Sequence, residues 1–544
     1  MTRFSITLSF VVALFLTTAC QSGSLFAPAP TSASPPAVTR PPVTPSPAPI
    51  RPATPRPDLP SGGAVILGLV SRPDSLNPIT ADNSTVRELT PLLYDSLLRV
   101  DPQSARLAPA LAQRWDYRAD GRQVTFHLPP NLKWSDGRAL TAADIADSLA
   151  ATGHPALQAF SRLDAPDDNT LTLTLAAIDC AAVTNLALLP LLPAREITAA
   201  TPVGSGPCVV AGQSERSLTL VRNRNYWGNR PRLDEVTVRF LNPDEITVAL
   251  SEGQFDVVGP LQPLPPGLEM SGFTGLTYPA AQMVYLAVNE NPKNGDPLPP
   301  EVRQALILAP DRAAILAEAL AGDGQLLAGP LLPGHWAANP NLTLPAYDPE
   351  TARTRLAQAG LQDSDGDGWL DLNGRRLELD IRLNGRNELH QNLGWLLSSY
   401  YREVGLLARA EGVAFDSVVD DLFTHDFQLA IFSWPILPDP DQRLYWHSTE
   451  NTVGLGLNFT SYRNPGLDEA LDEAVAVPGC RPEARAEVYE QVQAVLARAR
   501  PVDFLLAPNR HVLVGARLRG LEPGPFAPFT WNINDWYVEE AGSR

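Results

Sequence analysis

Apolar residues recur with two periodicities between residues 61 and 544, one typical of strands and one typical of helices. Alternating or short apolar runs predict strands at 65–70, 124–128, 171–175, 236–240, 377–383, 427–434 and 511–518. Helical spacing with caps and stops predicts helices that end near 97–98 and that cover 301–308, 312–320, 388–404 and 481–500. Because strands and helices interleave, the sequence predicts an α/β fold.

The clearest local signal lies at residues 107–149. A strand runs through a proline turn into Lys133-Trp134-Ser135-Asp136-Gly137. A helix then begins at Thr141, with Asp144 at capping-box spacing. Nothing in this block requires catalysis, since it consists of a strand, a turn and a capped helix.

The N-terminus predicts export. An uncharged run extends from Phe4 to Ala19 and stops at Cys20. It is short for a membrane span, which needs roughly 20 apolar residues, so we interpret residues 1–20 as a secretion signal. Leu16-Thr17-Thr18-Ala19-Cys20 resembles a bacterial lipobox, with Thr17 as a departure, which predicts lipidation of Cys20. The alternative is a cleaved secretory protein with an incidental cysteine.

Residues 21–60 contain 13 prolines among 40 residues and few large apolar side chains. Such a segment buries too little surface to offset its ordering entropy, which predicts a disordered tether. A tether of this kind fits a lipid anchor.

The charge balance narrows the possible partners. The formal net charge is −18, which argues against binding of nucleic acid or anionic headgroups. The seven histidines are scattered, and the chain contains no HExxH or paired CxxC motif. We therefore expect no cofactor and no nucleic-acid partner.

Several blocks together resemble the extracellular solute-binding proteins of family 5, the peptide, dipeptide and nickel receptors of ABC importers. They are residues 107–149, Leu76-Asn77-Pro78, residues 94–102, Gly204-Ser205-Gly206-Pro207 and Val284–Asn289. The resemblance implies a two-lobed periplasmic-binding-protein-like fold (type II, cluster C) with an extra small subdomain and a two-strand hinge.

The resemblance also divides the chain. It implies a discontinuous lobe I made of 61–105, 200–282 and 511–544. The extra subdomain would comprise 106–199, and lobe II (domain III) would comprise 283–510.

The implied function is a substrate-binding lipoprotein rather than an enzyme. It would be an extracytoplasmic monomer held to the membrane through Cys20, and it would deliver a peptide or dipeptide-like solute to ABC permease subunits with their ATPases. Two alternatives stay open: a non-peptide solute such as a sugar or nickel chelate on the same fold, or a secreted hydrolase that uses carboxylates. The hydrolase alternative lacks any GxSxG, phosphate-loop or zinc motif.

The resemblance places the ligand near residues 432–447. There, Asp439 or Asp441 would pair with the α-ammonium group of a peptide, or the two residues would only shape a turn beside Pro440. The other candidates are aromatic or amide side chains: Trp434, Tyr445, Trp446, Asn458, Tyr285 and Asn289.

The remaining cysteines and an aspartate-rich loop suggest two further features. Cys180 and Cys208 either form a disulfide or remain two buried free thiols. Asp363, Asp365, Asp367 and Asp371 match positions 1, 3, 5 and 9 of a calcium loop, but position 12 is Gly374. The loop is therefore either a plain turn or a weak calcium site.

Overall fold

The computed structural model describes residues 59–81, 83–265, 268, 272–293 and 296–539. The predicted signal peptide with Cys20 and the tether up to residue 58 lie outside the described residues. Residues Ser61–Arg544 form one compact unit, and its mixed strands and helices confirm the predicted α/β fold. We use the terms lobe I, subdomain and lobe II for the predicted ranges, whose boundaries stay a prediction.

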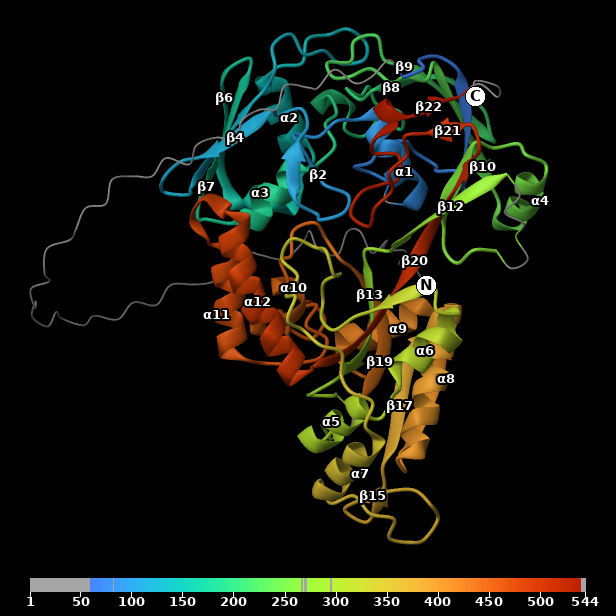
Figure 1. The fold of residues 1–544 in the computed structure, drawn as a ribbon. Coiled ribbons are helices and arrows are strands. Elements are labelled where there is room, and N and C mark those ends of the chain that lie inside the picture. The colour runs from blue at the N-terminus through green and yellow to red at the C-terminus, as the bar shows by residue number, and fades with distance from the viewer. Residues whose placement is uncertain (1–58, 82, 266–267, 269–271, 294–295, 540–544) are drawn as a thin grey trace, which may run out of the picture. The chain divides into compact units, whose positions relative to one another are not determined.

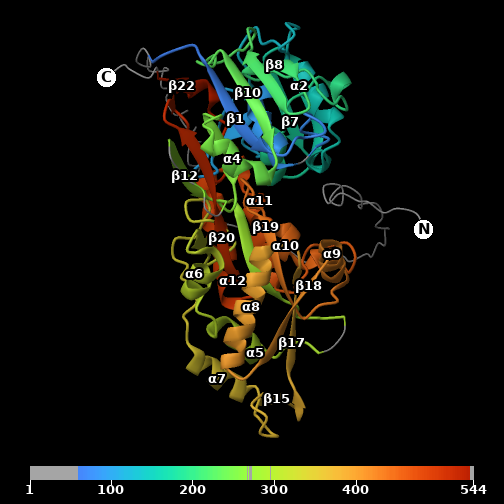
Figure 2. The same ribbon diagram turned by 90° about the vertical axis from the view of Figure 1, so that its right-hand side faces the viewer.

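A single long strand, β20 (Val502–Gly515), belongs to both lobes (Figures 1 and 2). Its first part pairs with β13 (Gln282–Val288) and β14 (Gly324–Leu326) of lobe II, up to Pro508. From Asn509 onward it pairs with β12 (Phe273–Pro279) of lobe I, and β11 (Val257–Leu261) pairs with it from His511. Because β12 and β13 are joined by only Ala280 and Ala281, two adjacent backbone segments connect the lobes.

Lobe I contains one half of the large sheet and its covering elements. In the twelve-stranded sheet the order is β18-β17-β19-β13-β20-β11-β1-β10-β9-β8, with β12 and β14 also paired to β20. The other elements of lobe I are β1 (Ala64–Val70), α1 (Ser84–Leu93), β2 (Leu98–Val100), β8 (Cys208–Gln213), β9 (Ser217–Arg222), β10 (Glu235–Leu241), α4 (Ile246–Ser251), β21 (Leu518–Arg519) and β22 (Tyr537–Val538).

The subdomain has a sheet and a core of its own. Four antiparallel strands lie in the order β4-β5-β7-β6, and Val124, Phe126 and Trp134 are buried between them and the helices. The predicted capping box is present, since the side chains of Thr141 and Asp144 each accept from the other residue's amide. The elements are β3 (Leu107–Pro109), β4 (Arg114–Tyr117), β5 (Gln123–His127), α2 (Ala142–Ala151), β6 (Phe160–Asp167), β7 (Thr170–Leu175) and α3 (Cys180–Ala187).

Lobe II buries its central strands on both faces. In β19 (Leu429–Pro435), Leu429 and Ile431 face the core that contains α8, while Ala430 and Phe432 face the core that contains α9, α11 and α12. The remaining elements are α5 (Pro300–Leu308), α6 (Arg312–Leu320), α7 (Pro349–Gln358), β15 (Asp371–Leu372), β16 (Arg375–Arg376), β17 (Glu378–Asn384), α8 (Glu388–Glu403), β18 (Leu407–Val413), α9 (Phe415–Thr424), α10 (Arg443–Trp446), α11 (Pro465–Val475) and α12 (Pro482–Ala499). None of the helices in the described ranges has the length and apolarity to cross a bilayer.

Two predicted elements differ from the structure. The first helix ends at Leu93 rather than near 97–98, because the amide of Gly206 bonds to Leu93 O at 3.0 Å and Tyr94 is already extended. A Cβ on Gly206 would lie 2.4 Å from the Leu93 carbonyl carbon, so this close approach requires glycine. The strand predicted at 511–518 begins at Val502, since the apolar run before Pro508 continues the same strand through lobe II.

The C-terminal segment returns to lobe I, where Phe529 and Trp536 are fully buried against β1 and α1. The amide of Phe529 donates to Glu88 Oε2 at 2.8 Å. Burial raises the pKa of the Glu88 carboxyl to about 8, although Arg510 and the amides of Phe529 and Thr530 lower it. Glu88 on α1 therefore binds the tail mainly as a protonated, neutral group.

This carboxyl makes stability depend on pH. The pKa of Glu88 is higher in the folded chain than the ordinary value of 4.5. Its contribution to the free energy of unfolding is therefore complete below about pH 4.5 and is lost as pH rises toward 8. We expect Glu88→Gln, which stays neutral and can still accept from Phe529, to raise the free energy of unfolding at pH 9 by about 1–4 kcal/mol and to change little at pH 4. Urea unfolding at both pH values measures this. Glu215→Gln, on an exposed turn, is the control, and equal shifts for both variants would contradict the assignment.

Candidate functional site

The predicted ligand segment begins where β19 ends. Pro435 is the last residue of the strand. Proline is tolerated at this position because it has no amide hydrogen to donate to a neighbouring strand. The loop 436–442 and helix α10 then carry the predicted aspartates and aromatic residues into one region. The segment is thus positioned by a strand that is buried on both faces.

Asp439 is buried and bound to an arginine of the same lobe. Arg485 on α12 donates from Nη2 to Asp439 Oδ1 and from Nη1 to Oδ2, both at 2.8 Å. Arg485 also donates to Ala474 O at 2.9 Å and to the Tyr489 hydroxyl at 3.1 Å. The carboxylate is therefore enclosed by the protein and already paired, and its predicted role as the anchor of a ligand ammonium group stays a prediction.

The charge of Asp439 is stabilised in place. Burial alone raises the pKa of the carboxyl, but the Arg485 guanidinium and hydrogen bonds from Arg485, Thr184 and the amide of Asp441 outweigh it. The net pKa lies below the ordinary value, so Asp439 is ionised at neutral pH. Thr184 belongs to α3 of the subdomain, so this buried pair also contacts a different part of the chain.

Asp441 is paired as well. Arg443 donates from Nε at 3.0 Å and from Nη2 at 2.8 Å to its carboxylate, and the same Nη2 donates to Asp179 at 3.0 Å. Asp179 is the N-cap of α3. Neither of the two predicted anchors presents an unpaired carboxylate.

Trp434 and Tyr445 come together as predicted. Their ring centroids lie 5.1 Å apart, and Trp434 also stacks on Phe459 at 6.0 Å. Phe432 lies against Trp434 at 5.4 Å and stacks on Phe415 at 6.3 Å. These five rings, which we call the aromatic cluster, are in continuous contact, and three of them, Phe432, Tyr445 and Phe459, are buried.

Part of the aromatic cluster and its surroundings is exposed to solvent. Phe415, the first residue of α9, is 39% exposed, and the neighbouring loop and α10 expose Leu437 at 43% and Leu444 at 40%. Sequence reasoning missed Phe415, because a lone aromatic residue at a helix start carries no signal of its own. His390 on α8 lies outside this cluster, since its Nε2 contacts Ser433 Oγ at 2.8 Å on the opposite face of β19 from Trp434.

Four other predicted ligand residues are buried and engaged internally. Trp446 donates to Gln442 at 2.7 Å, and Tyr285 is 4% exposed. Asn289 donates to Phe427 O at 3.0 Å, and Asn458 donates to Tyr462 O at 2.9 Å. Their polar groups stabilise the loops behind the aromatic cluster, so the structure does not bring these four side chains to an open surface.

The predicted pairing of Cys180 with Cys208 is wrong. Cys180 at the start of α3 forms a disulfide with Cys480, which lies between α11 and α12 and 300 residues away in sequence. Among the described cysteines, Cys208 has the free thiol, and burial raises its pKa to about 12. Cys208 begins β8 in the core of lobe I, out of reach of α3.

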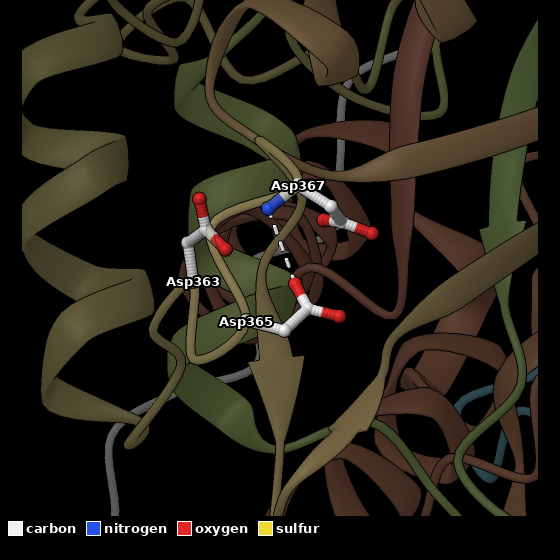
Figure 3. Close-up of side chains that lie close together, drawn as sticks. All are labelled: Asp363, Asp365 and Asp367. Atoms are coloured by element: carbon white, nitrogen blue, oxygen red, sulfur yellow. Dashed lines mark hydrogen bonds between the residues drawn. The ribbon is translucent and has the colours of Figure 1, made fainter.

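The aspartate-rich loop forms an exposed turn (Figure 3). Carboxylate oxygens of Asp363, Asp365 and Asp367 lie within 4.8 Å of one another. Asp363 accepts from the amides of Gly366 at 2.8 Å and Gly368 at 3.0 Å, as a plain turn would. Asp371 is buried and accepts from the amide of Ser364, apart from the other three. Calcium binding here stays a prediction.

Comparisons with known proteins agree with this architecture. Residues 106–454 match the family model described as bacterial extracellular solute-binding proteins, family 5 Middle. The oligopeptide-binding protein AppA of Bacillus subtilis is 24% identical, over 88% of this chain and 92% of the relative. The probable D,D-dipeptide-binding periplasmic protein DdpA of Escherichia coli is 24% identical, over 86% and 93%.

Solved structures share the fold. AppA of Bacillus subtilis in complex with a nonapeptide superposes with a TM-score of 0.69 at 23% identity, over 88% of this chain and all of that one. NikZ from Campylobacter jejuni in complex with Ni(L-His) superposes with a TM-score of 0.70 at 21% identity, over 88% and 99%. These likenesses confirm a two-lobed fold.

The paired aspartates lead to a stability prediction. Asp439→Ala leaves a buried, unpaired guanidinium on Arg485, which we expect to lower the free energy of unfolding by about 3–5 kcal/mol. The matched control is Asp441→Ala, whose partner Arg443 keeps Asp179 and whose loss should cost roughly 1 kcal/mol or less. Urea unfolding of both variants tests this difference. A stable Asp439→Ala protein that loses only ligand affinity would instead restore the anchor role.

Proposed function

Because the chain belongs to the bacterial extracellular solute-binding proteins of family 5, we propose that it captures a peptide or peptide-like solute between its two lobes and delivers it to the permease of an ABC importer. The main support is the match to an oligopeptide-binding protein over 88% of this chain and 92% of the relative. The chain crosses between the lobes at two adjacent places, between β12 and β13 and within β20. This supports the mechanism, because two lobes close about a short hinge segment.

We place the solute against the aromatic cluster of lobe II. Phe415 and Trp434 offer flat apolar walls, which suit varied side chains because apolar contact is not directional. The solute would shift the equilibrium between open and closed forms by binding the closed form better.

One observation favours a non-peptide solute as the second candidate. Asp439 and Asp441, the two carboxylates of the predicted anchor segment, are both paired with arginines. A ligand ammonium group would need another acceptor, whereas a neutral solute or a chelate would not. NikZ, with the same fold, is described in complex with Ni(L-His).

We further propose that the chain does not alter its solute. A hydrolase with two carboxylates needs one that accepts and one that donates a proton. Asp439 is fixed as a carboxylate by Arg485, and Asp441 is fixed by Arg443, so this pair is poorly suited to acid–base work. A monomer with a lipid anchor at Cys20 and a proline-rich tether fits delivery to a membrane permease.

Solute binding is tested by calorimetry against dipeptides, longer peptides, sugars and nickel chelates. We expect saturable binding of one class, and Trp434→Ala to weaken it about 10- to 100-fold, equivalent to roughly 1.4–2.7 kcal/mol. Trp395→Ala is the matched control, since this tryptophan is 65% exposed on α8. Binding of a sugar or chelate with no binding of peptides would reject the peptide assignment. Equal losses in both variants would reject the proposed site.

The anchor is tested in cells of a bacterium that processes lipoproteins. We expect the wild-type chain in the membrane fraction and labelled by an alkyne-bearing fatty acid, and Cys20→Ala in the soluble exported fraction without label. A wild-type chain that is exported but unlabelled would instead support a cleaved secretory protein.

A further inference from the structure

The contact between the subdomain and lobe II is covalent as well as polar. The disulfide Cys180–Cys480 joins α3 to the turn between α11 and α12, with Cα atoms 5.4 Å apart. Around it, Arg443 donates to Asp179 at 3.0 Å, and Thr184 on α3 is one of the groups that lower the pKa of Asp439. We call Asp179, Cys180, Thr184, Asp439, Arg443 and Cys480 the junction. Figure 1 shows the connection between α11 and α12 next to α3.

The junction is closely packed. A Cβ placed on Gly121 of the subdomain would lie 3.2 Å from the Cα of Pro478 and 3.3 Å from the amide nitrogen of Gly479. Cys180 is 1% exposed, and Arg106 of the subdomain forms a further ion pair with Glu483 at the start of α12. The two surfaces are therefore in direct backbone-level contact.

The subdomain is also bound firmly to lobe I. The amide of Ser135 donates to Gly204 O at 2.8 Å, and Asn225 donates to Ser135 O at 3.0 Å. The amide of Leu191 donates to Asp95 O at 2.8 Å. Leu97 and Leu98 are buried in the core of the subdomain. Lobe I and the subdomain therefore behave as one body.

The junction lies outside the hinge. The chain passes between the lobes at Ala280–Ala281 and at Pro508–Asn509, whereas Cys480 sits between two helices of lobe II. The hinge and the junction are thus separate links between the same two bodies, which also touch where the amide of Trp336 donates to Ser104 O at 2.8 Å and where His335 packs on Phe526. An opening that moved α3 away from the turn at Cys480 would be limited by the disulfide, because a disulfide holds its Cα atoms within about 7 Å.

We propose that the Cys180–Cys480 disulfide is a redox-dependent latch on the solute cleft, which slows solute exchange while oxidised and lets the lobes part when reduced. This inference deepens the proposed function and rests on it for the solute. The ion pairs of the junction cannot act as the latch alone, because water and salt replace partly exposed charge pairs at small cost.

The redox step balances with a dithiol as reductant. The disulfide takes up two electrons and two protons and becomes two thiols, while the dithiol is oxidised to its own disulfide. Cys480 is half-buried, so the bond has one side within reach of a small thiol, while Cys180 is enclosed. Cys208, a buried thiol in lobe I, takes no part.

The latch is tested on the full chain in three forms: oxidised, treated with a dithiol, and Cys180→Ala/Cys480→Ala. Small-angle scattering without solute measures lobe separation, and stopped-flow tryptophan fluorescence measures dissociation of whichever solute calorimetry identifies. We expect the second and third forms to be more extended and to release solute at least about tenfold faster, since such changes act mainly on the dissociation rate. Cys208→Ala should match the oxidised wild type, as should Arg443→Gln, which removes the ion pair and keeps the disulfide.

The outcomes separate the two proposals. If all three forms scatter alike and release solute at one rate, the latch is rejected while the proposed function stands. If reduction extends the chain but no peptide binds, the latch stands and the peptide assignment is rejected. Should the double variant fail to fold, the comparison of oxidised with dithiol-treated wild type, checked by circular dichroism, decides the question.

Discussion

The shared strand β20 is the constraint on which the two-lobed arrangement depends. Its backbone groups are buried and must be paired along 14 residues, so both lobes build their sheets onto the same strand. β12 and β13 satisfy one edge in turn, and β20 changes partner at Pro508–Asn509, so the chain passes between the lobes there and at Ala280–Ala281. A molecule built this way has two rigid halves and a narrow link, which is what capture by closure requires.

The buried charges near the end of β19 are bound to one another within the protein. Arg485 satisfies both oxygens of Asp439 and also reaches Ala474 O and Tyr489. Such a network is costly to break and adds little net stability compared with an apolar core. Its value lies in specifying how α12, the loop 436–442 and α3 fit together. In the proposed site the solute meets the aromatic cluster, whose rings contribute apolar area without requiring a particular ligand charge.

The junction limits how far lobe II can move relative to lobe I and the subdomain. A hinge alone leaves the far ends of the two bodies free, while a second covalent link joins them into a ring. Tight lobe contact through Asp179, Arg443 and Thr184 would by itself be reversible. The disulfide makes the contact persistent in an oxidising compartment and removable under reducing conditions.

Local pattern was enough to predict the α/β class, the capped helix at Thr141 and most strands and helices, because alternation, helical spacing and caps act over a few residues. Motif resemblance added the family and the two-lobed fold. Pattern failed where a long-range partner decided the outcome: helix α1 stops at Leu93 because Gly206 bonds there, and the strand before Pro508 extends through lobe II.

The chemistry of the site shows the same division. The sequence by itself determined that Trp434 lies at the end of a buried strand, and that two aspartates and then Tyr445 follow that strand. Only the tertiary structure decided that Arg485 and Arg443 take up those carboxylates and that Cys180 bonds to Cys480. The physical reason is that ion pairs and disulfides form between atoms a few ångströms apart, and packing alone determines which residues far apart in sequence come that close.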